Sequence, residues 1–207
     1  SQASALAAEV IGEIGATDDW KWQFTYSPAT QSNAAASWVN SRQEFVVDAK
    51  WAELDAAGRS VESVTYPDPV DGTPDPALDA IVMEFINGFL HPPLTVLSAR
   101  ELHLILAEAA LADGNESEAV THINHVREIK GSTPYDPATH DISVQDMIIH
   151  ERAVNLFMQP ARRLHDQYRF DIPASQWAPG SDAQRNGQVF IIGQNERVSN
   201  CFLLGTC

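Results

Sequence analysis

Apolar residues in the first part of the chain follow distinct local patterns. They recur four positions apart over residues 4–14, which predicts a helix that ends at Gly15. Aromatic residues occupy every second position over residues 20–26, and this alternation predicts a strand that carries its rings on one face. Residues 43–50 are a second strand candidate, and the proline- and aspartate-rich residues 66–76 predict a surface loop.

The second half of the chain shows helical periodicity with start and stop signals. Residues 98–112 and 116–130 predict two antiparallel helices, joined by a short turn at Gly114-Asn115, as in a tetratricopeptide hairpin. A third helix is predicted to begin near Ser143 and to break at Pro160, with a short helical continuation after it. The apolar residues expected to pack within the hairpin are Leu102, Ile105, Leu106 and Ala109 with Ala119, Ile123 and Val126.

These patterns predict a mainly α fold, with tetratricopeptide-like helical hairpins, long irregular loops and a few short β-strands. An aromatic-rich loop and strand region over residues 1–76 precedes a helical region over residues 77–207, and the two are expected to form one compact domain. Ser98 and Glu101 have the spacing of a capping box at the start of the first hairpin helix.

Net charge limits the possible partners. The 207 residues include 28 acidic and 13 basic side chains, which gives a formal net charge of −15. Such a field repels phosphate backbones, so nucleic-acid binding is not expected.

Cys201 and Cys207 lie close together at the end of the chain and far from every histidine. This spacing favours a local disulfide over a zinc site. A disulfide would in turn favour an oxidising compartment.

The sequence contains no recognisable catalytic constellation. It has no Gly-x-Ser-x-Gly motif, and His150-Glu151 lacks the second histidine of a zinc-protease motif because position 154 is Val154. His122 and His125 are three residues apart on a helix, but we expect them on a solvated face and not in a metal site. The sequence therefore predicts a protein that is not an enzyme, with no cofactor and no metal.

Several motifs in the second half, taken in order, resemble the SusD/RagB family. Residues 100–109 are similar to the start of the family's C-terminal hairpin, and the rest of that hairpin is matched by Gly114-Asn115, Glu118-Ala119 and residues 124–127. The later matches are residues 149–152, Arg162 or Arg163, residues 166–169, and residues 189–192 with Glu196 and Asn200. Residues 81–85 sit where the family has an extended strand before the hairpin.

The resemblance implies a SusD-like fold in which acidic and basic side chains lock the helices together. The residues of this expected ion-pair network are Glu101, Glu108, Arg127, Glu151, Arg152, Arg162, Asp166 and Arg169. Glu101 and Glu108 could instead be a catalytic carboxylate pair of the glycosidase kind. Pairing with arginine is favoured, because the planar guanidinium satisfies both oxygens of a carboxylate.

The resemblance also implies a function. Members of this family are surface nutrient-binding proteins that capture glycans or other oligomers for a TonB-dependent (SusC-like) transporter at the extracellular face of the cell outer membrane. This chain is similar to the C-terminal half of such a protein, so membrane attachment is expected only through an anchor not present in this chain. The alternative is a helical-hairpin scaffold subunit of an extracellular or cell-envelope assembly, with no small-molecule ligand.

Flat aromatic rings are the candidate ligand contacts, because sugars present apolar C–H faces against which a ring can lie. The opposing interpretation is that the same rings form part of an ordinary core. The candidate ligand-binding residues are Trp20, Trp22, Tyr26, Trp38 and Trp51.

Overall fold

The structure is a computed structural model that describes residues 1–44, 47, 50–54, 60–159 and 162–172. These residues belong to two compact units, one formed by residues 1–163 and one that begins at Leu164. The fold is mainly helical with a few short strands, as the sequence predicts. None of the described helices is long and apolar enough to cross a membrane.

Eight helical segments and four strands make up the described chain. The helical segments are α1 (Gln2–Ile14), α2 (Ala34–Ala36), the π-helix η1 (Ser37–Ser41), α3 (Pro76–Asn87), α4 (Ala99–Ala112), α5 (Glu116–Lys130), α6 (Val144–Asn155) and α7 (Arg162–Arg169). The strands are β1 (Lys21–Phe24), β2 (Ala52–Leu54), β3 (Ser60–Val64) and β4 (Leu94–Ser98).

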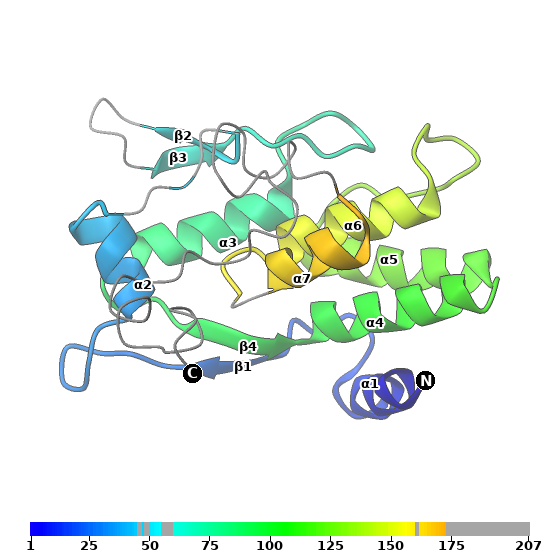
Figure 1. The fold of residues 1–207 in the computed structure, drawn as a ribbon, viewed down its shortest axis with the longest axis horizontal. Helices are drawn as coiled ribbons and strands as arrows, with labels where there is room; N and C mark the ends of the chain where they lie inside the picture. Colours follow the sequence, from blue (N-terminus) through cyan, green and yellow to red (C-terminus); the bar gives the residue numbers. More distant parts are fainter. Residues whose placement is uncertain (45–46, 48–49, 55–59, 160–161, 173–207) are drawn as a thin grey trace, which may run out of the picture. The chain divides into compact units, whose positions relative to one another are not determined.

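The predicted helical hairpin is confirmed, and α4 and α5 lie side by side (Figure 1). Asn115 caps α5 by accepting the Glu118 amide at 3.3 Å, and Gly131 ends it in the left-handed conformation with φ 72°. Helix α6 packs against both α4 and α5 and is capped by Ser143, as predicted.

The buried face of α4 differs from the predicted one. Leu102 is buried as expected, but the other buried apolar residues of α4 are Ala99, Leu104 and Ala107. Ile105, Leu106 and Ala109 are only half-buried. The reason is that α4 packs against α1 as well as against α5 and α6, so its buried surface is wider than a single apolar stripe.

The extended strand expected over residues 81–85 is wrong, since these residues lie inside α3. The helix begins where the Asp75 carboxylate accepts the backbone amides of Ala77 and Leu78 at 2.9 and 3.0 Å, with Pro76 at its first position. The extended segment before the hairpin is β4, which runs directly into α4.

The strands form two antiparallel pairs, which Figure 1 shows on opposite sides of α3. The predicted aromatic strand is β1, and it pairs with β4. The predicted strand over residues 43–50 falls partly outside the described residues, and its described residues are not in a strand. The second observed pair is formed instead by β2 and β3.

The loop over residues 66–76 is more buried than the predicted surface loop. Its two ends are joined by a bridge between Pro67 and Pro74. Asp68 and Asp75 are enclosed, because each carboxylate accepts hydrogen bonds from helices of the second half. This loop therefore joins the N-terminal region, predicted over residues 1–76, to the helical region that follows it. The predicted boundary between residues 76 and 77 lies inside the first unit.

Candidate functional site

Strand β1 presents two exposed rings. Trp22 and Phe24 are 54% and 53% exposed, and their ring centroids lie 6.0 Å apart with an interplanar angle of 52°. Both point to the same face because they are two positions apart on a strand. Pairing with β4 holds the backbone beneath them, with Trp22 opposite Leu97 and Phe24 opposite Leu94. The two rings form an exposed apolar patch, which we call the β1 ring pair.

The other predicted ring contacts lie in different environments. Trp20 and Tyr26, at the two ends of the aromatic run, are half-buried, and Trp38 on η1 is 39% exposed. Trp51 is a core residue at 8% exposed, with its ring 4.4 Å from that of Tyr66 and 5.4 Å from that of Phe157. Phe24 was not among the predicted contacts, although the alternation that includes Trp22 includes it equally.

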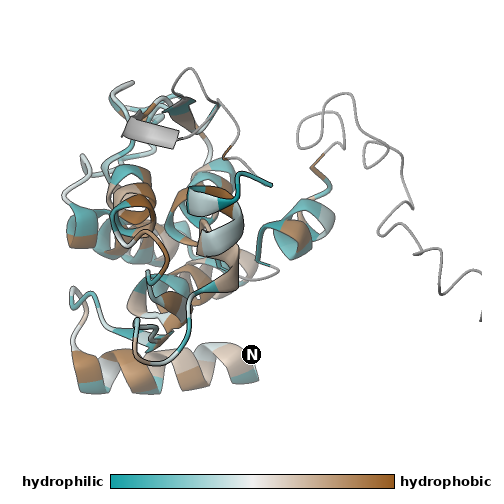
Figure 2. Ribbon diagram, turned by 90° about the vertical axis from the view of Figure 1, so that its left-hand side faces the viewer, coloured by the Kyte–Doolittle hydropathy of each residue, from teal (hydrophilic) through white to brown (hydrophobic). Residues whose placement is uncertain are grey.

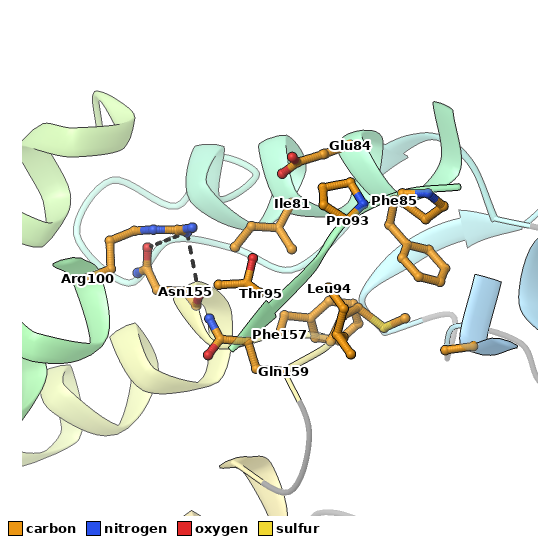
Figure 3. A pocket seen from close by; sticks show the side chains of 13 residues that line it. Ile81, Glu84, Phe85, Pro93, Leu94, Thr95, Arg100, Asn155, Phe157 and Gln159 are labelled. Atoms are coloured by element: carbon orange, nitrogen blue, oxygen red, sulfur yellow. Dashed lines mark hydrogen bonds between the residues drawn. The ribbon is translucent and has the colours of Figure 1, made fainter. Parts of the chain in front are cut away.

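A small cavity lies between α3, β4 and the end of α6 (Figure 3). Its volume is about 50 Å³, which is enough for ordered water but far below the roughly 300–1,000 Å³ of typical ligand pockets. Buried Arg100 closes one side, with Nη1 3.4 Å from the Asn155 side-chain oxygen and Nε 3.2 Å from Asp19 Oδ1. The buried Gln159 Oε1 in its wall has no hydrogen-bond partner within the described residues, which suits a bridging water.

Arg127 on α5 is the centre of a buried ion-pair group. Its two terminal nitrogens donate to Glu151 Oε1 at 2.6 Å and to Asp68 Oδ2 at 2.7 Å, and its Nε donates to the Thr133 carbonyl at 2.5 Å. Asn155 donates to the second Glu151 oxygen at 2.7 Å. Burial alone would lower the pKa of Arg127, but its two acidic neighbours outweigh burial and raise that pKa above its usual value.

The two glutamates of α4 are each engaged by an arginine. Arg162 Nε lies 2.6 Å from Glu101 Oε1, and Arg152 Nη1 lies 3.0 Å from Glu108 Oε1. The Glu101 amide donates to Ser98 Oγ at 3.3 Å, which is one half of the predicted capping box. Because its carboxylate pairs with Arg162, the Glu101 contacts support a structural role more than a catalytic one.

The remaining predicted polar sites have separate positions. Asp166 and Arg169 pair with each other within α7, at 3.3 Å. Cys201 and Cys207 lie outside the described residues, so their disulfide stays a prediction. Sequence reasoning missed a buried pair, in which His150 Nε2 lies 2.8 Å from Asp75 Oδ2. It also missed the Asp68 contact to Arg127, and only a fold that joins residues 59 apart could reveal it.

Three histidines gather on the opposite side of the hairpin. His103 on α4 and His122 and His125 on α5 each place a ring nitrogen within 4.8 Å of those of the other two. The expectation of a solvated face for His122 and His125 is wrong, since both are half-buried against α4. Burial lowers the pKa of His103 to about 4 and also lowers the pKa of His122, so both rings are neutral at pH 7. This histidine cluster is the one group of potential metal ligands found among the described residues.

Comparison with known proteins gives one match. Residues 92–200 match the SusD family, a region that runs from just before β4 through the hairpin, α6 and α7. The search for similar curated proteins and the search for similar solved structures found no match.

Proposed function

Since the match covers more than half of its residues, the chain belongs to the SusD family, and we propose on that premise that it is a surface glycan-binding protein. Proteins of this family bind nutrients at the cell surface. The ligand class proposed here is a neutral glycan or similar oligomer with apolar ring faces. The β1 ring pair is the proposed contact, with Trp38 as a further candidate.

The exposure of Trp22 and Phe24 carries this proposal. An aromatic ring placed only for packing is normally enclosed, and contiguous exposed apolar groups mark interaction sites. The cavity beside Arg100, at about 50 Å³, is too small for a sugar. A shallow surface site is therefore the better candidate, and an extended oligomer can lie along such a site.

The same premise supports the proposed partner and location. We place the protein at the extracellular face of the outer membrane, where it would pass captured oligomers to a TonB-dependent transporter of the SusC kind. Co-purification of the full-length protein with a large β-barrel from solubilised membranes tests this step independently of glycan binding.

Ring removal tests the glycan site. Trp22→Ala and Phe24→Ala should each weaken retention in polysaccharide-containing native gels by about 3- to 10-fold, the amount expected from one ring contact. Phe89→Ala is the matched control, because Phe89 is 54% exposed, as Trp22 is, but lies between α3 and β4. Thermal unfolding should change little in all three variants.

Two results would count against the proposal. Equal retention of wild type and both β1 variants on every polysaccharide tested would remove the β1 ring pair from the binding site. Loss of retention in Phe89→Ala as well would show that the effect is not specific to β1. If no glycan binds and a protein partner is captured only by wild type, the scaffold alternative is favoured.

A further inference from the structure

The histidine cluster is assembled from both helices of the hairpin. His122 and His125 are three positions apart, so they lie on one face of α5, and His103 faces them from α4. The ring centroid of His103 is 5.3 Å from that of His122 and 5.0 Å from that of His125. Three imidazoles therefore converge on a single space between two well-packed helices.

The orientation of His103 is set by the residue that follows α1 and its terminal glycine. His103 Nε2 lies 2.6 Å from the Ala16 carbonyl oxygen, and because a carbonyl can only accept, Nε2 carries the hydrogen. In the neutral ring the lone pair is then on Nδ1, which points at His122 Nδ1 at 3.1 Å. A metal-binding histidine typically donates from one nitrogen to a backbone carbonyl and coordinates through the other.

His125 supplies the second observation. Its Nδ1 is buried and has no hydrogen-bond partner within the described residues. Leaving a buried polar nitrogen unpaired is unfavourable, and such atoms are rare in folded proteins. A cation between the three rings would give this part of the cluster a partner that the protein itself does not provide.

We propose that His103, His122 and His125 bind one divalent transition-metal ion, with zinc as the best match. Imidazole nitrogen suits zinc, copper and nickel, whereas calcium and magnesium require oxygen ligands. Two nitrogens about 2.0–2.1 Å from a tetrahedral zinc ion are roughly 3.4 Å apart, close to the 3.1 Å between His103 and His122. One ring nitrogen of each histidine lies within 4.8 Å of those of the other two.

The site is reachable from solvent through His122. That residue lines an open hollow of about 310 Å³, together with Glu118 and Asp113. Glu118 Oε1 lies 3.9 Å from His122 Nε2, so a carboxylate stands beside the entrance. On binding, the hydrogen of His122 Nδ1 moves to Nε2 by exchange with water, so that the Nδ1 lone pair coordinates zinc and the ring stays neutral. The fourth coordination position is left for water or for a ligand that enters the hollow.

Zinc binding to the full chain, stripped with a chelator and dialysed, tests the proposal. Titration against a chromogenic zinc chelator should give one zinc ion per chain. His122→Gln and His125→Gln should each weaken that affinity by about 100-fold or more, since loss even of a supporting group costs about 10- to 100-fold. His91→Gln is the control, because His91 lies in the loop after α3, outside the cluster.

A spectroscopic readout and the thermal midpoint complete the experiment. Cobalt should give the intense visible bands of a tetrahedral site in wild type and His91→Gln only, and zinc should raise the thermal midpoint in those two proteins only. His103 is left unchanged because its ring is fully buried and its replacement can unfold the chain. No zinc binding by wild type at micromolar concentration, or equal affinity in wild type and His122→Gln, overturns the proposal.

Discussion

The two sides of the α4–α5 hairpin bury polar groups in opposite ways. On one side, each of the three Arg127 side-chain nitrogens donates a hydrogen bond, and Glu151 uses both of its oxygens. On the other side, His125 Nδ1 is buried without a partner within the described residues, and the His103 and His122 nitrogens face each other. Glu101, which is ion-paired with Arg162, and His103, which belongs to the histidine cluster, are two positions apart on α4. They therefore lie about 200° apart around this helix, and α4 contributes to both sides.

This difference separates structural from functional polar groups. A buried charge is tolerated when its partners are complete, and the ion-pair side then fixes how the helices and the loop over residues 66–76 meet. A buried group with an incomplete set of partners is unfavourable unless something else completes it. The ion-pair side therefore explains the fold, whereas the histidine side points to a ligand.

The largest expected effect comes from the ion-pair side. Arg127→Ala leaves Asp68 and Glu151 as buried, uncompensated carboxylates and should lower the free energy of unfolding by about 3–5 kcal/mol. Urea denaturation measures this loss. Arg42→Ala is the control, because the Arg42–Glu44 pair is exposed and should contribute less than about 1 kcal/mol. Similar losses in the free energy of unfolding in the two variants would show that the buried ion-pair group contributes no more to stability than the exposed pair.

Core truncation should also distinguish the two sides. Leu104 is fully buried and packs with Val126 and Leu156, so Leu104→Ala should cost about 2–4 kcal/mol. Leu106 lines the open hollow beside His122, so Leu106→Ala should cost about 1 kcal/mol. Thermal or urea unfolding of both variants gives the comparison. A larger loss of unfolding free energy in Leu106→Ala than in Leu104→Ala would place the core on the histidine side.

A smaller, pH-dependent effect is expected at Asp75. Burial acts to raise its pKa, but hydrogen bonds from His150 and from the amides of Leu78 and Ala77 outweigh burial and lower it. A carboxyl pKa that is lower in the folded state than in the unfolded state stabilises the fold at pH values above the unfolded-state pKa. This stabilisation is lost as the pH falls through the folded-state pKa. Asp75→Asn keeps the helix cap, so at pH 7 it should cost only about 1–2 kcal/mol.

The same variant has a defined acid response. The stability difference between wild type and Asp75→Asn should shrink as the pH falls below about 4, where the Asp75 carboxyl of the unfolded chain becomes protonated while that of the folded chain is still ionised. Urea midpoints measured at pH 7, 5 and 3.5 follow this change. A difference that is constant over that range would mean that the Asp75 charge does not contribute to stability.

Sequence reasoning was most accurate where the signal is local. The starts of α5 and α6 at Asn115 and Ser143, and the end of α5 at Gly131, were all predicted. Each of these signals acts through hydrogen bonds between residues a few positions apart. The strand expected over residues 81–85 is wrong for the opposite reason. It rests on the position of these residues relative to the hairpin in the SusD/RagB family, and not on the helix start signal at Asp75-Pro76 that precedes them.

The candidate sites were predicted only in part for a related reason. The alternation that includes Trp22 and Phe24 shows that their rings share a face, but not whether that face is covered. Trp51 and Trp22 are the same residue type, yet the first packs against Tyr66 and Phe157 while the second stays exposed. Exposure depends on what packs above each ring, which no local pattern contains.

Local sequence signals therefore predict the helical hairpin, its caps and the residue types available for chemistry, because these follow from backbone hydrogen bonding and helical spacing. Which polar groups meet depends on the tertiary structure. Arg127 finds Asp68 from 59 residues away, and His103 is oriented by Ala16 from 87 residues away. Such pairings depend on how α1, the loop and the helices pack, since contacts between residues far apart in the chain form only when the chain folds.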